Sequence, residues 1–184
     1  MIRAVLVLTT LLAATAATAA PKPPSVVFHG EQYFHRWSMN GQNEYTPKGS
    51  EDLAVWSNML TINSTRVDPT RMPELASTIR ANYEKAGATI LRVDSADGPS
   101  GKTEYFQAAV FTTAAFMEAA WTRVFLVEGR PLIATYAKRF YGADVGAQMS
   151  AWLKQDGPSL EKSLRTWTGA PTLAALEALP QSTK

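Results

Sequence analysis

The segment of this chain whose residue types and spacing best suit a chemical reaction is ADGPSGKT, residues 96–103. It resembles a phosphate-binding loop, in which backbone N–H groups surround phosphates while Lys102 and Thr103 would contact phosphate oxygens and Mg²⁺. Such a loop must lead into a helix whose N-terminus faces the phosphate, but the next residues, EYFQAAVF, favour a strand. No apolar strand farther along ends in an aspartate that would hold the metal. We therefore predict a turn between two strands.

The only two histidines alternate with a carboxylate in the series His29, Glu31, Tyr33 and His35, which one strand would present on a single face. Two imidazoles and a carboxylate are sufficient to bind Zn²⁺ with one open position. At about 3.3 Å per residue, however, an extended strand separates the two histidines by roughly 20 Å. The chain also has no cysteine. We therefore expect no metal site and no bound cofactor.

Acidic residues are the other candidates for catalysis, because the chain has neither a cysteine nor a Gly-x-Ser-x-Gly turn that would expose a nucleophilic serine. A pair of carboxylates is enough for hydrolysis by general acid and base, but such a pair is assembled in space and leaves no signature in the sequence. The candidates are Asp94, Asp97, Glu104 and Glu118. A hydrolase that uses such a pair, or His35, is an alternative to a non-catalytic protein.

Aromatic residues are the chain's richest resource for binding, with five Trp and six Tyr. Three of the tryptophans occupy apolar positions of predicted elements and are expected in the core. Trp37 and Trp56 lie close to predicted loops, near Tyr33 and Tyr45. An exposed aromatic cluster at these four residues would suit a binding surface. The alternative is that they too belong to the core.

The first residues have the three parts of a secretory signal. Arg3 supplies the positive charge, residues 4–12 form a short apolar segment, and Ala17-Thr18-Ala19 is a cleavage pattern of small residues. The apolar segment is too short to span about 30 Å of hydrocarbon, which takes about 20 residues. We expect cleavage after Ala19 and a mature protein that is periplasmic or secreted, with no membrane span.

Hydrophobic periodicity predicts the elements that would position these residues. Leu75, Ile79, Tyr83 and Ala86 fall on one face of a helix over residues 73–87. The Ala-rich segment 107–121 is compatible with a strand or, over part of its length, with a helix. The predicted strands cover residues 33–39, 43–47, 58–65, 88–95, 103–113 and 117–141, the last with a turn at Glu128-Gly129, and further helices cover residues 143–155 and 159–167.

Length and composition indicate one folded domain. The chain has 184 residues, 46% of them hydrophobic and 18% charged, with a net charge of +2. This excludes a disordered chain, and the near-neutral charge gives no electrostatic reason to expect nucleic-acid binding. The order of elements predicts an α+β fold in which helices flank an antiparallel β-sheet as an α-β-α sandwich. We divide the chain into a signal peptide (1–19), an extended leader (20–29), the domain (30–170) and a C-terminal tail (171–184).

The chain resembles the PsbP/Mog1/DcrB-like proteins over residues 30–167. The resemblance lies in HRWSMNGQNEYTPKG leading into NMLTINST, in the helix PELASTIRANYEKAG, in the strand pair across VEGR, and in the helix around MSAWLK. The chain also looks like uncharacterised bacterial exported proteins. The family resemblance implies an α-β-α sandwich that acts in binding or assembly, and it supplies no catalytic residues.

Together these observations favour an exported, non-catalytic envelope protein that binds another protein or an envelope component. The sheet edge, or the aromatic residues around Trp37 and Trp56, would make the contact. A periplasmic hydrolase is one alternative. A carrier of a small ligand is the other, and it would need an apolar cavity of about 300 Å³ or more. The sequence leaves the partner and the oligomeric state open.

Overall fold

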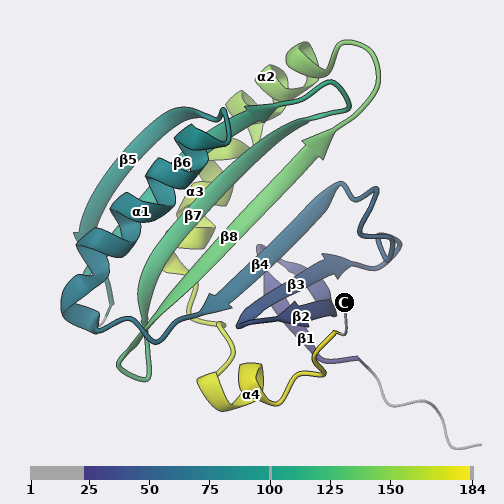
Figure 1. The fold of residues 1–184 in the computed structure, drawn as a ribbon. Helices are drawn as coiled ribbons and strands as arrows, with labels where there is room; N and C mark the ends of the chain where they lie inside the picture. The colour runs from purple at the N-terminus through teal and green to yellow at the C-terminus, as the bar shows by residue number, and fades with distance from the viewer. Residues whose placement is uncertain (1–22, 100, 183–184) are drawn as a thin grey trace, which may run out of the picture.

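The computed structural model describes residues 23–99 and 101–182, so the predicted signal peptide lies outside the described residues. The chain forms one sheet of eight antiparallel strands in the order β1-β2-β3-β4-β8-β7-β6-β5 (Figure 1). Strands β1 to β4 and strands β5 to β8 are two meanders of consecutive strands, joined where β4 pairs with β8. The predicted α+β fold with an antiparallel sheet is confirmed.

The strands are longest in the second meander. Their bounds are β1 Ser25–Phe28, β2 Glu31–Met39, β3 Gln42–Pro47, β4 Asn58–Ser64, β5 Thr89–Asp97, β6 Thr103–Thr112, β7 Met117–Val127 and β8 Arg130–Phe140. The helices are the short 3₁₀ helix η1 Pro69–Arg71, α1 Met72–Lys85, α2 Val145–Gln155, α3 Gly157–Thr166 and α4 Leu173–Glu177. None of the helices in the described ranges is long and apolar enough to cross a membrane.

The Ala-rich segment 107–121 belongs to β6 and β7. Its alanines favour a helix by propensity alone, but both strands are hydrogen-bonded to a neighbour on each side. Ala108, Ala109, Ala119 and Ala120 are all buried on these two strands. Their small side chains leave room for the large aromatic residues and the helices that cover the sheet, so tertiary packing overrides propensity here.

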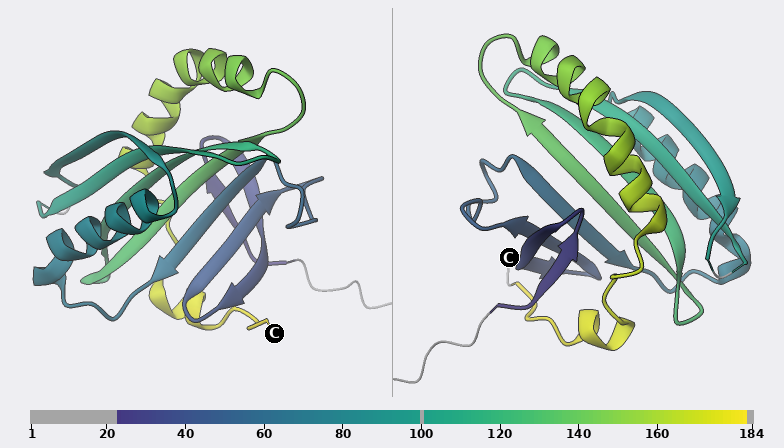
Figure 2. Two further views of the ribbon diagram at one scale, coloured as in Figure 1. Left: turned by 45° about the horizontal axis from the view of Figure 1, so that its top comes forward. Right: turned by 180° about the vertical axis from the view of Figure 1, so that it is seen from behind.

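Helices cover both faces of the sheet, but unequally (Figure 2). On one face, α2 and α3 pack against β7 and β8, and α3 buries Leu160 and Leu164. On the other face, α1 lies over β5 and β6, and Met72 is its only buried residue. The main core therefore lies under α2 and α3, while α1 is packed loosely.

The predicted leader and the predicted C-terminal tail both contain segments that pack on the sheet. Residues 25–28 of the predicted leader form β1, which pairs with β2 and buries Val26 and Phe28. The predicted tail contains α4, and it buries Leu173, Leu176 and Leu179. Both segments thus pack against the domain predicted over residues 30–170, and the boundaries at 30 and 170 stay a prediction. Short apolar segments of this kind are buried only once the sheet is present to receive them.

A buried arginine ties β6 and β7 to the end of α3. Arg123 is 2% exposed and donates hydrogen bonds to both carboxylate oxygens of Glu104, at 2.7 and 3.0 Å. It also donates to the carbonyl oxygens of Leu164 and Trp167, at 2.9 and 2.8 Å, where the last carbonyls of a helix lack partners. Gly98 packs directly against the Glu104 side chain, where a Cβ would collide with the carboxylate.

Candidate functional site

The most exposed element of the sheet is the edge strand β5. It pairs only with β6, and of its nine residues all but Ile90 and Asp94 are exposed. Leu91 and Val93 are 51% and 52% exposed, large values for branched apolar side chains. An edge strand presents unpaired backbone N–H and C=O groups to solvent. Strand β5 is therefore a nine-residue template for pairing with another strand.

The position of β5 follows from the path of the chain. Strand β4 lies in the middle of the sheet, and α1 then crosses one face to bring the chain to the far edge (Figure 1). Strands β6, β7 and β8 return stepwise until β8 pairs with β4. The last strand position beyond β5 therefore stays empty among the described residues.

A bulge in β5 sends neighbouring apolar side chains to opposite faces. The register with β6 shifts between Ile90 and Arg92, as happens when one extra residue enters a strand. Leu91 and Arg92 line a groove on the α3 side, whereas Val93 lines a cavity on the α1 side. The exposed edge thus borders a hollow on each face.

The groove on the α3 side has a volume of about 530 Å³ and lies between β5 and α3. A second hollow of about 390 Å³, lined by Asp97, Glu104 and Arg165 among others, continues it toward the β5–β6 turn. Trp121 forms part of the floor of the groove. Its charged lining residues are Arg92, Glu161, Lys162 and Arg165.

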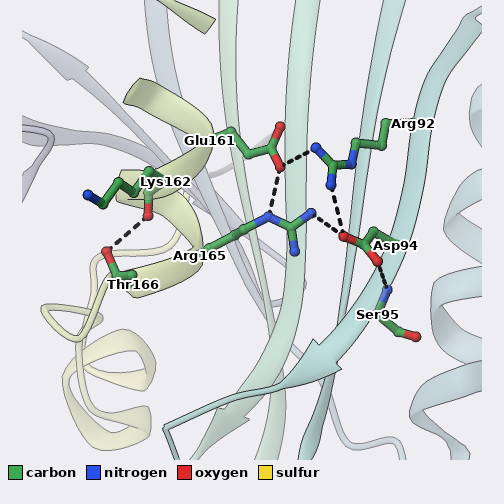
Figure 3. A network of polar contacts seen from close by, with 7 residues as sticks. All are labelled: Arg92, Asp94, Ser95, Glu161, Lys162, Arg165 and Thr166. Carbon is green, nitrogen blue, oxygen red and sulfur yellow. Dashed lines mark hydrogen bonds and ion pairs between the residues drawn. The ribbon is translucent and has the colours of Figure 1, made fainter. Parts of the chain in front are cut away.

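Three of these side chains, Arg92, Glu161 and Arg165, form a closed ring of ion pairs with Asp94 of β5 (Figure 3). Arg92 of β5 contacts Asp94 at 3.2 Å and Glu161 at 2.9 Å. Arg165 of α3 contacts the same two carboxylates, each at 2.9 Å. Charges of opposite sign therefore alternate around the ring, and the ring connects α3 to the edge strand without leaving a net charge.

The surroundings of Asp94 favour its charged form. The backbone N–H of Ser95, followed by the guanidinium groups of Arg165 and Arg92, lowers the pKa of this carboxyl below its usual range. A carboxylate that is stabilised as an anion donates a proton poorly. Asp94 is therefore suited to holding β5 against α3 and not to acting as a general acid.

The cavity on the α1 side has a volume of about 150 Å³. Its floor is formed by the buried residues Gln107, Thr122 and Val124 of β6 and β7. Its mouth is marked by exposed lining residues, Ser77 and Arg80 of α1 and Val93 of β5. The cavity therefore opens beside the free edge of β5.

The four aromatic residues predicted to bind a partner are mostly in the interior. Tyr33, Tyr45 and Trp56 are 1%, 2% and 4% exposed, and Trp37 is half-buried. Burial raises the pKa of Tyr45 to about 12, and the Arg139 guanidinium stacks 4.0 Å from the ring of Trp56. Packing in the interior accounts for Tyr33, Tyr45 and Trp56. Of the four residues, only Trp37 is accessible to a partner. Their binding role stays a prediction, limited by this burial.

His35 lies in a buried chain of hydrogen bonds with Ser38 and Asn43. Asn43 Nδ2 donates to the carbonyl oxygens of Gly41 and Ile62, so its Oδ1 is the acceptor for the Ser38 hydroxyl, at 2.7 Å. The single hydroxyl proton of Ser38 is thus used, and His35 Nε2, 2.6 Å from Ser38 Oγ, must be the donor. His35 therefore cannot accept a proton from Ser38 in this arrangement, which is that of a structural network.

This network makes stability depend on pH. Burial lowers the pKa of His35 below its usual value of 6.5, so the unfolded chain binds the proton at a higher pH than the folded chain does. The free energy of unfolding is therefore expected to fall as the pH decreases from about 6.5 toward the folded-state pKa. Urea denaturation at pH 7.0 and 5.5 measures this fall. The decrease in the free energy of unfolding should be smaller in His35→Gln and unchanged in His29→Gln. An equal decrease in the unmodified chain and in both variants would contradict the assignment of this pH dependence to His35.

The candidate acidic residues are each engaged elsewhere. Asp94 belongs to the charged ring, Glu104 pairs with Arg123, and Glu118 contacts Arg139 at 2.7 Å. Asp97 accepts a hydrogen bond from Thr103 at 3.2 Å. Three of the four carboxylates are thus held by guanidinium groups, which favour the anion. This arrangement gives no support to a pair that shares protons.

The segment that resembles a phosphate-binding loop connects two antiparallel strands, as predicted. Strand β5 ends at Asp97 and β6 begins at Thr103, so the helix that a phosphate-binding loop requires is replaced by a strand. Within the described ranges, no group of three or more histidine and acidic side chains is placed to hold a metal ion. His29 lies in the turn between β1 and β2, with a positive φ of 50°.

Sequence reasoning did not identify the edge position of β5 or the two hollows beside it. One signal was present in ATILRVDS, where Arg92 and Asp94 share one face of the predicted strand with Ile90, while Leu91 and Val93 lie on the other face. A strand that is buried on one face shows a cleaner alternation. Mixed faces are typical of an edge strand that bears charges.

Comparison with known proteins gives similarity of fold only. No protein-family model matches the sequence, and no curated protein is detectably similar to it. One similar solved structure is the Ran-binding protein Mog1p of Saccharomyces cerevisiae, with a TM-score of 0.44 and 9% identity over 65% of this chain and 73% of that chain. Another is a point mutant of the protein Mog1, with a TM-score of 0.44 and 9% identity over 77% of this chain and 88% of that one.

Proposed function

We propose that this chain is an exported, non-catalytic protein that binds another protein by strand addition at β5. An extended segment of the partner would pair with the free edge and continue the sheet. The observation that carries the proposal is the exposure of β5, whose branched apolar residues Leu91 and Val93 are half-exposed on opposite sides of the strand. Export is supported by the predicted signal peptide, and N-terminal sequencing of the exported protein, expected to begin at Ala20, tests it.

The length of the uncovered edge strand supports strand addition at β5. Folded proteins usually shorten or cover edge strands, because unpaired backbone groups attract other chains. Strand β5 has nine residues, against four in β1 at the opposite edge. In strand addition, main-chain hydrogen bonds supply affinity and alternate side chains supply specificity. The two hollows beside β5 are placed to receive those alternate side chains.

The residues that line the two hollows indicate which side chains the partner segment should carry. Side chains on one face of the added strand would lie against the charged ring of Arg92, Asp94, Glu161 and Arg165. Side chains on the other face would meet the smaller cavity under α1. The partner segment should therefore carry polar residues on one face and an apolar or aromatic residue on the other. A water-soluble peptide in an extended conformation fits these two faces better than a lipid surface does.

Charge placed on the edge should block binding. The probe is a displayed library of random twelve-residue peptides selected on the purified chain, with affinity measured by fluorescence anisotropy. Val93→Lys is expected to weaken the selected peptides at least tenfold, because it puts a charge on the pairing edge. Val27→Lys is the matched control, since Val27 is 60% exposed on β1 at the other edge. It should leave affinity unchanged.

Hydrogen exchange locates the contact. Bound peptide should slow the exchange of amides in β5 and leave those in β1 unaffected. Equal loss of affinity in Val93→Lys and Val27→Lys, or protection away from β5, would contradict strand addition at this edge. Concentration-dependent dimerisation that Val93→Lys abolishes would contradict it as well, because a second copy of the chain would then occupy the edge.

A further inference from the structure

The cavity between α1 and the sheet contains a polar group whose hydrogen bonding is incomplete. Gln107 of β6 is 6% exposed and lines the cavity, and its amide nitrogen has no hydrogen-bond partner among the described residues. Nearly all buried polar groups in proteins are paired, because an unpaired one loses its hydrogen bonds to water without replacement. An unpaired amide beside a cavity indicates that a ligand completes the site.

Small residues on α1 account for the empty space. Ala76, Ser77 and Ile79 of α1 line the cavity, and the first two side chains are small. Only Met72 of this helix is fully buried, and Leu75 is half-buried. Helix α1 therefore roofs the cavity without filling it.

The volume limits the ligand to one ring. At about 150 Å³, the cavity is smaller than the 300–1,000 Å³ that is usual for a drug-sized ligand. An apolar cavity of about this size is able to hold a single benzene ring. A single amino-acid side chain matches this size, whereas a nucleotide or a multi-ring compound does not.

The floor of the cavity defines the polar group of the ligand. Thr122 is already engaged, because its hydroxyl contacts the Tyr83 hydroxyl at 2.9 Å and the Thr135 hydroxyl at 3.0 Å. This leaves the Gln107 amide nitrogen as the buried polar group of the floor that lacks a partner among the described residues. A hydroxyl group both donates and accepts, so it pairs with either end of an amide. The neighbouring Val124 of β7 and Ala76 and Ile79 of α1 are apolar, which disfavours a charged group beside them.

We propose that this cavity binds the side chain of a tyrosine in the partner segment, with the phenol ring under α1 and its hydroxyl hydrogen-bonded to Gln107. This inference rests on the proposed function, since the mouth of the cavity opens beside Val93 on the pairing edge. A residue of the added strand next to Val93 and on the same face would point toward α1. The cavity thereby selects one position of the partner, while the backbone of β5 provides the pairing.

Two probes that differ by one hydroxyl test the pocket. p-Cresol is the side chain of tyrosine and toluene that of phenylalanine, and each is titrated into the ¹⁵N-labelled chain and followed by NMR. p-Cresol should shift the Gln107 side-chain amide and the backbone amides of β6 and α1. It should bind about fivefold tighter than toluene, the value of one net hydrogen bond.

Gln107→Leu removes the polar group and keeps the approximate volume. In this variant p-cresol should lose its advantage over toluene, whereas Gln155→Leu, on the exposed surface of α2, should keep it. Ala76→Phe is a second variant, which should fill the cavity and abolish binding of both probes. Equal binding of the two probes to the unmodified chain, or NMR shifts confined to residues away from Gln107, would overturn the assignment of the cavity as a phenol site.

The peptide measurements separate this inference from strand addition. Selected peptides should contain a tyrosine whose replacement by phenylalanine weakens binding about fivefold, and Gln107→Leu should cancel that difference. Peptides that protect β5 yet show no preference for tyrosine would overturn the pocket and leave strand addition intact. Binding of p-cresol at Gln107 without any peptide binding at β5 would overturn the tyrosine assignment and make a free phenol the ligand.

Discussion

Replacing Arg123 with methionine is expected to lower the free energy of unfolding by about 3–5 kcal/mol, as measured by urea denaturation. Arg123 is 2% exposed and makes four hydrogen bonds, two to Glu104 and one each to the carbonyl oxygens of Leu164 and Trp167. Methionine fills much of the same space but supplies no donor. The Glu104 carboxylate, whose side chain is 12% exposed, would keep its buried position without a counter-charge.

A surface ion pair provides the control. Arg71 and Glu74 contact each other at 2.7 Å, but both side chains are 65% exposed. Arg71→Met should change the free energy of unfolding by less than about 0.5 kcal/mol, because water screens exposed pairs. Adding Glu104→Leu to Arg123→Met removes the stranded charge and should recover part of the loss. A loss for Arg123→Met as small as that for Arg71→Met would show that the buried pair is not needed.

Replacing Leu176 with alanine is expected to lower the free energy of unfolding by about 2–5 kcal/mol, the usual loss for a buried leucine. Leu176 of α4 is 2% exposed and packs in the main core together with Leu173 and Leu179. The hydroxyl of Thr172 accepts a hydrogen bond from Ala175 N–H at 3.1 Å and so caps this short helix. These contacts make the last part of the chain a structural element.

Thermal or urea unfolding tests whether α4 is part of the folded domain or a dispensable tail. Leu91→Ala is the control, because Leu91 is 51% exposed and its truncation should change stability by less than about 0.5 kcal/mol. If Leu176→Ala behaves like Leu91→Ala, residues 171–184 are a tail, as their composition suggested. If it shows the full loss, α4 belongs to the domain.

Local patterns predicted most of the elements correctly. The helix expected over residues 73–87 is α1, and the strands expected over residues 33–39 and 43–47 are β2 and β3. These predictions succeed because helical and strand periodicity are set by residues a few positions apart. The segment 107–121 was ambiguous because its alanines favour a helix by propensity, whereas pairing with strands on both sides makes the residues of β6 and β7 strands.

The candidate site was not predictable in the same way. Asp94 was a candidate acid by residue type, but its partner Arg165 lies 71 residues away in α3. Glu104 was another candidate, and its partner Arg123 is 19 residues away on the adjacent strand. Nothing in the local sequence marks either carboxylate as paired. The chemistry of both residues changed from catalytic candidate to structural ion pair when those contacts were known.

The sequence by itself determined which segments become strands and helices, and that no local catalytic or cysteine-based motif is present. It also placed ADGPSGKT in a turn, because the residues after it favour a strand. Only the tertiary structure decided that residues 89–97 form the free edge, that Tyr33, Tyr45 and Trp56 are interior, and that Gln107 lines a cavity under α1. The physical reason is that periodicity is local, whereas strand order, burial and ion pairing depend on contacts between residues far apart in the chain.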